Sequence, residues 1–178
     1  MNIALYRGIG FWPSRCIEWF SRSPYSHAAF VFDDGAARVA QDLADSRELT
    51  RLYCRAPGAT VEAWSGGVKC SPGPGFLHTP GTPVDILAFS RPLEAAEERA
   101  LILLLDSQIG IPYDYWDIIR FVTRRQGNPG GRLFCSELVA QDCQDIGRPL
   151  FRATESWRVP PDWIARTNEL RLVKSITT

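Results

Sequence analysis

The chain has 178 residues, and its 20 Lys and Arg residues balance 20 Asp and Glu residues, so the formal net charge is zero. This length fits one domain with a sizeable buried core, and we expect a single domain over the whole chain. The zero net charge excludes the strongly basic surface typical of nucleic-acid binding. No stretch approaches the ~18–20 apolar residues that span a bilayer, so we expect no integral membrane segment.

Short apolar or alternating runs that end at Gly, Pro or Asp predict strands, mostly in the first half of the chain. A turn signal, Asp33-Asp34-Gly35, follows one of these runs, so the next run is expected to be its hairpin partner. In chain order the expected strands cover residues 3–6, 27–32, 36–43, 61–64, 84–89 and 170–176.

Helical spacing of apolar residues predicts helices, mainly in the second half of the chain. A segment rich in Pro and Gly, residues 70–83, is expected to be a surface loop. Strands followed by helices favour an α+β fold, an antiparallel sheet packed against helices on one side. The expected helices cover residues 13–20, 93–108, 113–124, 135–146 and 162–166.

The run Phe134-Cys135-Ser136-Glu137 places a cysteine where an apolar helix begins, after a Gly-rich break. A thiol at a helix N-terminus lies at the positive end of the helix dipole, beside N–H groups without partners in the helix. This environment favours the thiolate, which is the nucleophilic form. Because a free cysteine is also a common small core residue, Cys135 alone does not establish catalysis.

A thiol nucleophile needs an imidazole base, and the imidazole needs a third group that orients it. His27 begins an apolar strand and Glu62 lies in another, so neighbouring strands would bring the two side chains together. A structural histidine and a solvent-facing glutamate are the ordinary alternatives, and Asp33, Asp34 and Asp42 are alternative orienting groups. The other histidine, His78, is expected to be solvated in its loop.

The chain has five cysteines, without CxxC spacing. This pattern fits reduced thiols better than a disulfide framework or a zinc site. A metal site from Cys70 and His78 lacks a second pair of ligands, so no metal and no cofactor is expected. The N-terminal residues lack the features of a signal peptide, which favours a cytoplasmic protein, with release by lysis or another non-classical route left open.

Taken together, several motifs resemble the circularly permuted NlpC-type cysteine hydrolases, in particular the YiiX-like group of the papain-like class. That class also includes the relatives of lecithin retinol acyltransferase. The order His, Glu, Cys along the chain corresponds to the permuted form. The motifs that carry the resemblance are Ser26-His27, Glu62-Ala63 with Gly67-Val68, Gly110-Ile111-Pro112-Tyr113-Asp114, Phe134 to Val139, and Pro160 to Trp163.

The resemblance implies a nucleophile at Cys135, a general base at His27 and a third, polar member at Glu62. It also leads us to expect substrate contacts from Tyr113, and from Tyr25 and Ser26 beside the base. The expected activity is hydrolysis or acyl transfer at amide or ester bonds, with a peptide, an amide or an acyl lipid as substrate.

A non-catalytic module that binds a peptide or lipid on the same scaffold, as in a phage or structural component, is the alternative function. Ordinary thiol reactivity at Cys135 would favour this alternative. The sequence does not determine the oligomeric state.

Overall fold

The computed structural model describes residues 1–8, 23–112, 134–152 and 154–178. Two of the expected helices, residues 13–20 and 113–124, therefore lie outside the described residues, as does Tyr113. The strands are β1 (Asn2–Arg7), β2 (Tyr25–Val31), β3 (Thr60–Trp64), β4 (Gly67–Ser71), β5 (Pro83–Phe89) and β6 (Leu170–Thr177). The helices are α2 (Asp34–Asp45), α3 (Ala95–Gln108), α5 (Cys135–Asp145), α6 (Pro161–Arg166) and a 3₁₀ turn, η1 (Ser156–Arg158).

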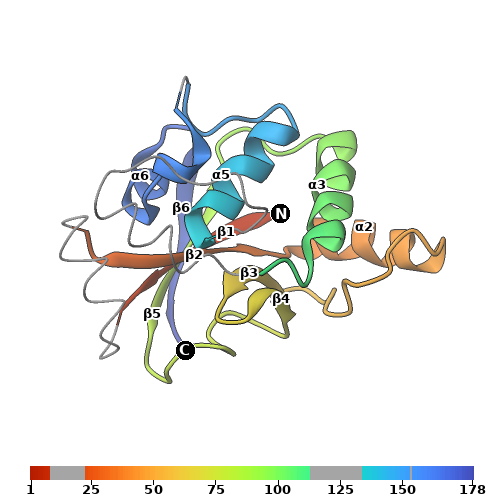
Figure 1. The fold of residues 1–178 in the computed structure, drawn as a ribbon, viewed down its shortest axis with the longest axis horizontal. Helices are drawn as coiled ribbons and strands as arrows, with labels where there is room; N and C mark the ends of the chain where they lie inside the picture. Colours follow the sequence, from red (N-terminus) through yellow and green to blue (C-terminus); the bar gives the residue numbers. More distant parts are fainter. Residues whose placement is uncertain (9–22, 113–133, 153) are drawn as a thin grey trace.

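The strands form one six-stranded sheet in the order β4-β3-β2-β1-β5-β6, and every neighbouring pair is antiparallel. Alternate strand residues such as Ile3, Ala28 and Phe30 join residues of α2, α3, α5 and α6 in one apolar core. Figure 1 shows these helices gathered over the sheet. The α+β prediction, an antiparallel sheet with helices packed on one side, is confirmed.

The opposite face of the sheet carries a smaller apolar cluster, which includes Ala4, Tyr6 and Ala29. Tyr6 is the cross-strand partner of His27. Because side chains alternate between the two faces of a strand, His27 belongs to this second face rather than to the face under the helices.

Strands β2 and β3 pair over a short distance, at Phe30–Val61 and Val31–Thr60. Their pairing does not continue to His27 on β2 or to Ala63 on β3 within the described residues. Helix α5 contacts both strands. The unpaired end of these two strands is therefore where a residue of α5 can approach the second face of the sheet.

The strand predicted at residues 36–43 is wrong, because this segment belongs to α2. The Asp33 carboxylate accepts a hydrogen bond from the Ala36 N–H at 2.9 Å and so caps the helix. The buried residues of α2 recur at helical spacing rather than in alternation: Ala36, Ala37, Ala40 and Leu43. The Asp-Asp-Gly signal thus begins a helix and not a hairpin.

The loop predicted at residues 70–83 is wrong at its start, because Cys70 and Ser71 complete β4. This strand lies at the edge of the sheet. Its outer side is covered by the chain after α3: the Val68 N–H donates to the Ile111 carbonyl at 2.8 Å, and the Gly110 N–H donates to the Val68 carbonyl at 2.9 Å. Two motifs that are far apart in sequence, Gly67-Val68 and Gly110-Ile111, are therefore in direct contact.

No helix in the described parts of the chain is long and apolar enough to cross a membrane. The four cysteines within those parts are free thiols: Cys54, Cys70, Cys135 and Cys143.

Gly67 has a φ of +119°, and an added Cβ would lie 2.6 Å from the Ile111 carbonyl oxygen. Gly67→Ala is therefore expected to lower the free energy of unfolding by more than the roughly 1–3 kcal/mol of backbone strain alone. Gly58→Ala is the matched control, because Gly58 has a φ of +89° but no atom within 4 Å of the added Cβ. Urea denaturation measures both variants, and equal losses would contradict the close packing at Gly67.

A buried amide and carboxyl connect α3 to α5. The Gln108 Nε2 donates to Asp142 Oδ1 at 2.7 Å. The other two oxygens, Gln108 Oε1 and Asp142 Oδ2, are buried and find no hydrogen-bond partner among the described residues. Both atoms are hydrogen-bond acceptors, so they can bond to each other only when Asp142 carries a proton. In agreement, burial raises the pKa of Asp142 to about 7.

An acid whose pKa is raised by folding makes the protein less stable as the pH rises, here between about 4 and 7. Asp142→Asn provides a permanent N–H donor, so we expect it to raise the free energy of unfolding at pH 8 by on the order of 1–4 kcal/mol. Asp145→Asn makes the same charge change on an exposed residue of the same helix and serves as the control. Urea denaturation from pH 4 to 8 checks this, and an unchanged pH profile in Asp142→Asn would refute the account.

Candidate functional site

The first turn of α5 is fixed at both of its sides. The Ser136 hydroxyl donates to the Val159 carbonyl at 2.6 Å, which ties the helix start to the chain just before Pro160. The Glu137 carboxylate accepts from the Phe134 backbone N–H at 3.4 Å. Cys135 is the first residue of this helix and is 3% exposed. The sequence motif around Cys135 therefore holds the thiol in one position at the helix N-terminus.

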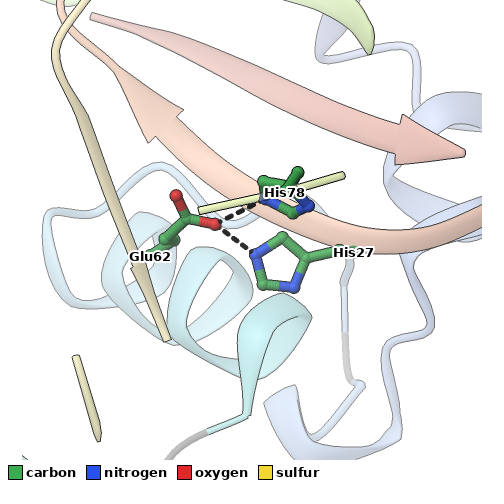
Figure 2. Close-up of side chains that lie close together, drawn as sticks. All are labelled: His27, Glu62 and His78. Atoms are coloured by element: carbon green, nitrogen blue, oxygen red, sulfur yellow. Dashed lines mark hydrogen bonds and ion pairs between the residues drawn. The ribbon is translucent and has the colours of Figure 1, made fainter. Parts of the chain in front are cut away.

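Cys135 lies against β2 where this strand is unpaired with β3. Its sulfur lies close enough to the His27 side chain and to the Ala28 and Ser136 backbone N–H groups that these groups lower the pKa of the thiol. Figure 2 shows one ring nitrogen of His27 directed at Glu62 and the other directed away, toward the first turn of α5. The structure thus brings His27 and Cys135 together at the open end of the two strands.

The Glu62 side chain lies on the same face of the sheet as His27 and has no exposed surface. Its Oε2 lies 2.7 Å from Nε2 of His27 and 2.9 Å from Nε2 of His78. Its other oxygen accepts a hydrogen bond from the Thr60 hydroxyl at 3.3 Å. One carboxylate therefore holds both imidazole rings (Figure 2).

Charges in this cluster shift the pKa values in opposite directions. Burial would raise the pKa of Glu62, but the hydrogen bonds from His27 and His78 outweigh it and lower the pKa to about 2. Burial would lower the pKa of His27, but the Cys135 sulfur and Glu62 raise it to about 10. Despite its burial, the pKa of Cys135 falls because of the neighbouring His27. The arrangement favours a thiolate beside an imidazolium.

His78 is a functional-site candidate that the sequence did not reveal, and the expectation that it is solvated is wrong. Its ring stacks on Tyr6 with a centroid distance of 3.9 Å and packs against Trp64 at 4.5 Å. Burial lowers the pKa of His78, although Glu62 opposes this effect, so the ring is neutral.

The loop that carries His78 folds back over the sheet because it is tied to the end of β6. The Gly81 N–H donates to the Thr178 carbonyl, and the Thr178 N–H donates to the Thr82 carbonyl at 3.1 Å. The segment makes successive turns that bring His78 against the sheet, while Phe76, Pro80 and Gly81 in the same segment are exposed. The sequence signal that could have identified His78 was the presence of only two histidines in the chain.

The predicted substrate-binding residues already have partners in the protein. The Tyr25 hydroxyl donates to the Asp85 carboxylate at 2.6 Å, and Arg7 reaches the same oxygen at 2.8 Å. The Ser26 hydroxyl is buried and lies 3.5 Å from the Tyr6 carbonyl. Substrate binding by Tyr25 and Ser26 stays a prediction, as it does for Tyr113 outside the described residues.

One cluster in the described residues could hold a metal ion, and it consists of His27, Glu62 and His78. Their nearest ligand atoms all lie within 4.8 Å of one another. Two imidazoles and a carboxylate are a common ligand set for zinc. The pair considered from the sequence, Cys70 with His78, is not this cluster, because Cys70 belongs to the core on the helical side of the sheet.

A separate cavity of about 830 Å³ lies between α2 and the chain before β3. Arg38, Tyr53 and Arg55 are among its lining residues, and none of Cys135, His27, Glu62 and His78 lines it. The cavity and the reactive cluster are therefore different places in the fold.

No protein-family model matches this chain, and no curated protein matches it. A similar fold occurs in the crystal structure of a protein described as the metalloprotein YiiX from Escherichia coli O157:H7. The TM-score is 0.63 at 15% sequence identity, and the match covers 99% of this chain and 97% of that one. At this identity the likeness establishes a YiiX-like fold.

Because the pKa of Glu62 is lowered to about 2, its ion pair stabilises the folded protein above the unfolded value near 4.5 and loses this effect as the pH falls toward 2. Glu62→Gln should therefore be less stable than the wild type at pH 6 by on the order of 1–3 kcal/mol. The difference in the free energy of unfolding between Glu62→Gln and the wild type should be smaller at pH 3. Urea denaturation at the two pH values measures it, with Glu155→Gln as the control for an exposed ion-paired carboxylate. A difference independent of pH would contradict the assigned ionisation.

Proposed function

We propose that this protein is a thiol hydrolase or acyltransferase that acts on amide or ester bonds through Cys135, His27 and Glu62. The observation that carries the proposal is the position of Cys135 at the N-terminus of α5, where its pKa is lowered by a His27 ring that is hydrogen-bonded to Glu62. The triad of nucleophile, base and orienting group is the usual requirement for nucleophilic catalysis.

In the proposed reaction, His27 accepts the Cys135 proton at Nδ1, and the thiolate attacks the substrate carbonyl carbon. The C–N or C–O bond breaks, the leaving amine or alcohol takes the proton from His27, and the acyl group stays on sulfur as a thioester. Water, activated by His27, then hydrolyses the thioester, or a second acceptor takes the acyl group. Glu62 holds the imidazole ring and stabilises its positive charge.

Backbone N–H groups support the charged intermediate in this proposal. The Cys135 N–H lies at the N-terminus of α5, where N–H groups have no partner within the helix. Such a group is suited to stabilise the oxyanion that forms when the thiolate attacks the carbonyl. The helix dipole acts in the same direction.

The order of His27, Glu62 and Cys135 along the chain supports a finer assignment, the circularly permuted NlpC-type branch of the papain-like hydrolases. The contacts between motifs also support it: Gly67 packs on Ile111, and Ser136 bonds to Val159 just before the Pro160-Pro161 pair. The substrate in this proposal is a peptide, another amide or an acyl lipid.

Metal binding is the second candidate function, and the observation that favours it is the His27, Glu62 and His78 cluster. The protein with the similar fold is described as a metalloprotein. The two candidates share His27 and Glu62, so they concern the same site.

The hydrolase proposal predicts that Cys135 reacts with iodoacetamide at a pH well below the usual thiol range of about 8.5. Labelling is followed as a function of pH, in EDTA, by peptide mass spectrometry that resolves each cysteine. Cys143 on the same helix is the internal control, because burial raises its pKa and it should stay unlabelled.

The same measurement in His27→Ala should return Cys135 to ordinary thiol behaviour, with labelling at pH 6 reduced at least about tenfold. Glu62→Gln should produce a smaller loss, because the ring remains but loses its anionic partner. If Cys135 reacts like the other cysteines in the wild type, the non-catalytic binding module becomes the better description.

A further inference from the structure

Three side chains of the types that can bind metal ions lie close together on the face of the sheet opposite the helices. His27 comes from β2, Glu62 from β3 and His78 from the loop after β4. The three side chains are almost fully buried: 7% of each histidine side chain and none of the glutamate side chain is exposed. Figure 2 shows both rings directing a nitrogen at the same carboxylate.

The type of donor atom selects the class of ion. Two imidazole nitrogens and one carboxylate oxygen suit zinc and other first-row transition ions, whereas calcium and magnesium prefer oxygen ligands throughout. The nearby Cys135 thiol does not belong to this ligand set, which consists of His27, Glu62 and His78. We therefore consider Zn²⁺ as the probe ion.

The separations of the donor atoms are close to what such an ion requires. Two ligands that are each about 2.1 Å from a tetrahedral zinc ion lie about 3.4 Å apart. The two imidazole nitrogens lie 2.7 and 2.9 Å from Glu62 Oε2, which are hydrogen-bond lengths. Relative to the carboxylate oxygen, the His27 nitrogen would have to move away by about 0.7 Å and the His78 nitrogen by about 0.5 Å. His78 lies on a loop rather than in a strand.

The surrounding contacts resemble the outer shell of a metal site, in which ligands are held by further hydrogen bonds. The second oxygen of Glu62, Oε1, accepts a hydrogen bond from the Thr60 hydroxyl. That hydroxyl in turn lies 2.6 Å from the Ser71 hydroxyl. Tyr6 stacks on the His78 ring and meets the His27 ring edge-on at 5.4 Å. These contacts orient all three side chains before any ion binds.

We propose that His27, Glu62 and His78 bind one divalent transition-metal ion such as Zn²⁺, and that the metal-bound form cannot use His27 as a base. The second part rests on the proposed function, because it concerns the same His27. A metal on Nε2 displaces the proton that bonds His27 to Glu62, and the remaining ring proton then lies on Nδ1, toward Cys135. A ring in this state has no lone pair left to accept a proton, so metal binding and base action exclude each other.

Zinc binding is measured on the reduced, metal-free full chain by competition with a chromogenic chelator. The wild type should bind one Zn²⁺, and Cys135→Ala and Cys54→Ser should bind it equally well. Cys54 is a necessary control because its thiol lies close enough to Cys70 for Cys70 to raise its pKa, and two neighbouring thiols could also bind zinc. His78→Ala and Glu62→Gln should each lose at least about tenfold in affinity, with circular dichroism to check that both variants are folded.

The exclusion of base action is tested by ¹⁵N NMR of the histidine side chains in Cys135→Ala. Without metal, Nε2 of His27 should carry a proton. With one equivalent of Zn²⁺, Nε2 should lose its proton, and Nδ1 should carry the one remaining ring proton. Zinc binding that is unchanged in both His78→Ala and Glu62→Gln would overturn the proposal, as would loss of binding in Cys54→Ser or absence of binding in the wild type.

Failure of the metal proposal leaves the hydrolase proposal intact, because Cys135 labelling is measured in EDTA. Failure of the hydrolase proposal leaves the metal site intact, because zinc binding is measured in a chain without the Cys135 thiol. If the His27 ring keeps its Nε2 proton in the presence of Zn²⁺, only the statement that metal binding prevents base action is overturned.

Discussion

The candidate site depends on the carboxylate of Glu62, which is fully buried and bonds to two imidazole rings through one oxygen. A buried carboxylate is costly unless it is paired with charge and hydrogen-bond donors. The imidazolium of His27 and the neutral ring of His78 supply both. In turn, the Cys135 sulfur and the Glu62 carboxylate together raise the pKa of His27, and His27 lowers the pKa of Cys135. Glu62 therefore favours the ionised thiol through His27.

The sheet makes this chain of contacts possible by its short pairing between β2 and β3. Because the strands are joined only at one end, the first turn of α5 reaches β2 from the helical side while Glu62 and His78 reach His27 from the other side. At this unpaired end, the Ala28 backbone N–H contributes to the lowered pKa of Cys135. A fully paired sheet would separate the thiol from the carboxylate.

Local patterns predicted the elements whose apolar periodicity is clear, such as β2, β5 and α5. They failed at residues 36–43. The short apolar pattern of this segment fits a strand or a helix, and the helix forms because the Asp33 carboxylate caps its N-terminus. They also failed at β4, which is an edge strand beside two glycines and a Pro-rich segment. In the first case one side-chain contact, the Asp33 cap, determines the structure. In the second case a distant segment does so, because Ile111 hydrogen-bonds to Val68 of β4.

For the site, the sequence predicted Cys135, His27 and Glu62. In the structure His27 is hydrogen-bonded to Glu62, and His27 lowers the pKa of Cys135. Sequence patterns missed His78 and Tyr6, because the position of the Pro-rich loop depends on hydrogen bonds to Thr178, about a hundred residues away in the chain. The roles of the three residues in catalysis remain proposals. Sequence patterns could not reveal residues whose positions depend on contacts between a loop and a distant part of the chain.

The proposed reaction requires a covalent acyl-enzyme at Cys135, and this species can be trapped. The protein is mixed with p-nitrophenyl esters of short and long acyl chains, quenched in acid within seconds and analysed by intact and peptide mass spectrometry. We predict one acyl group, located on Cys135, that is absent from Cys135→Ala and nearly absent from His27→Ala. Acylation spread over several residues, or equal acylation of the Cys135→Ala chain, would contradict the proposed reaction.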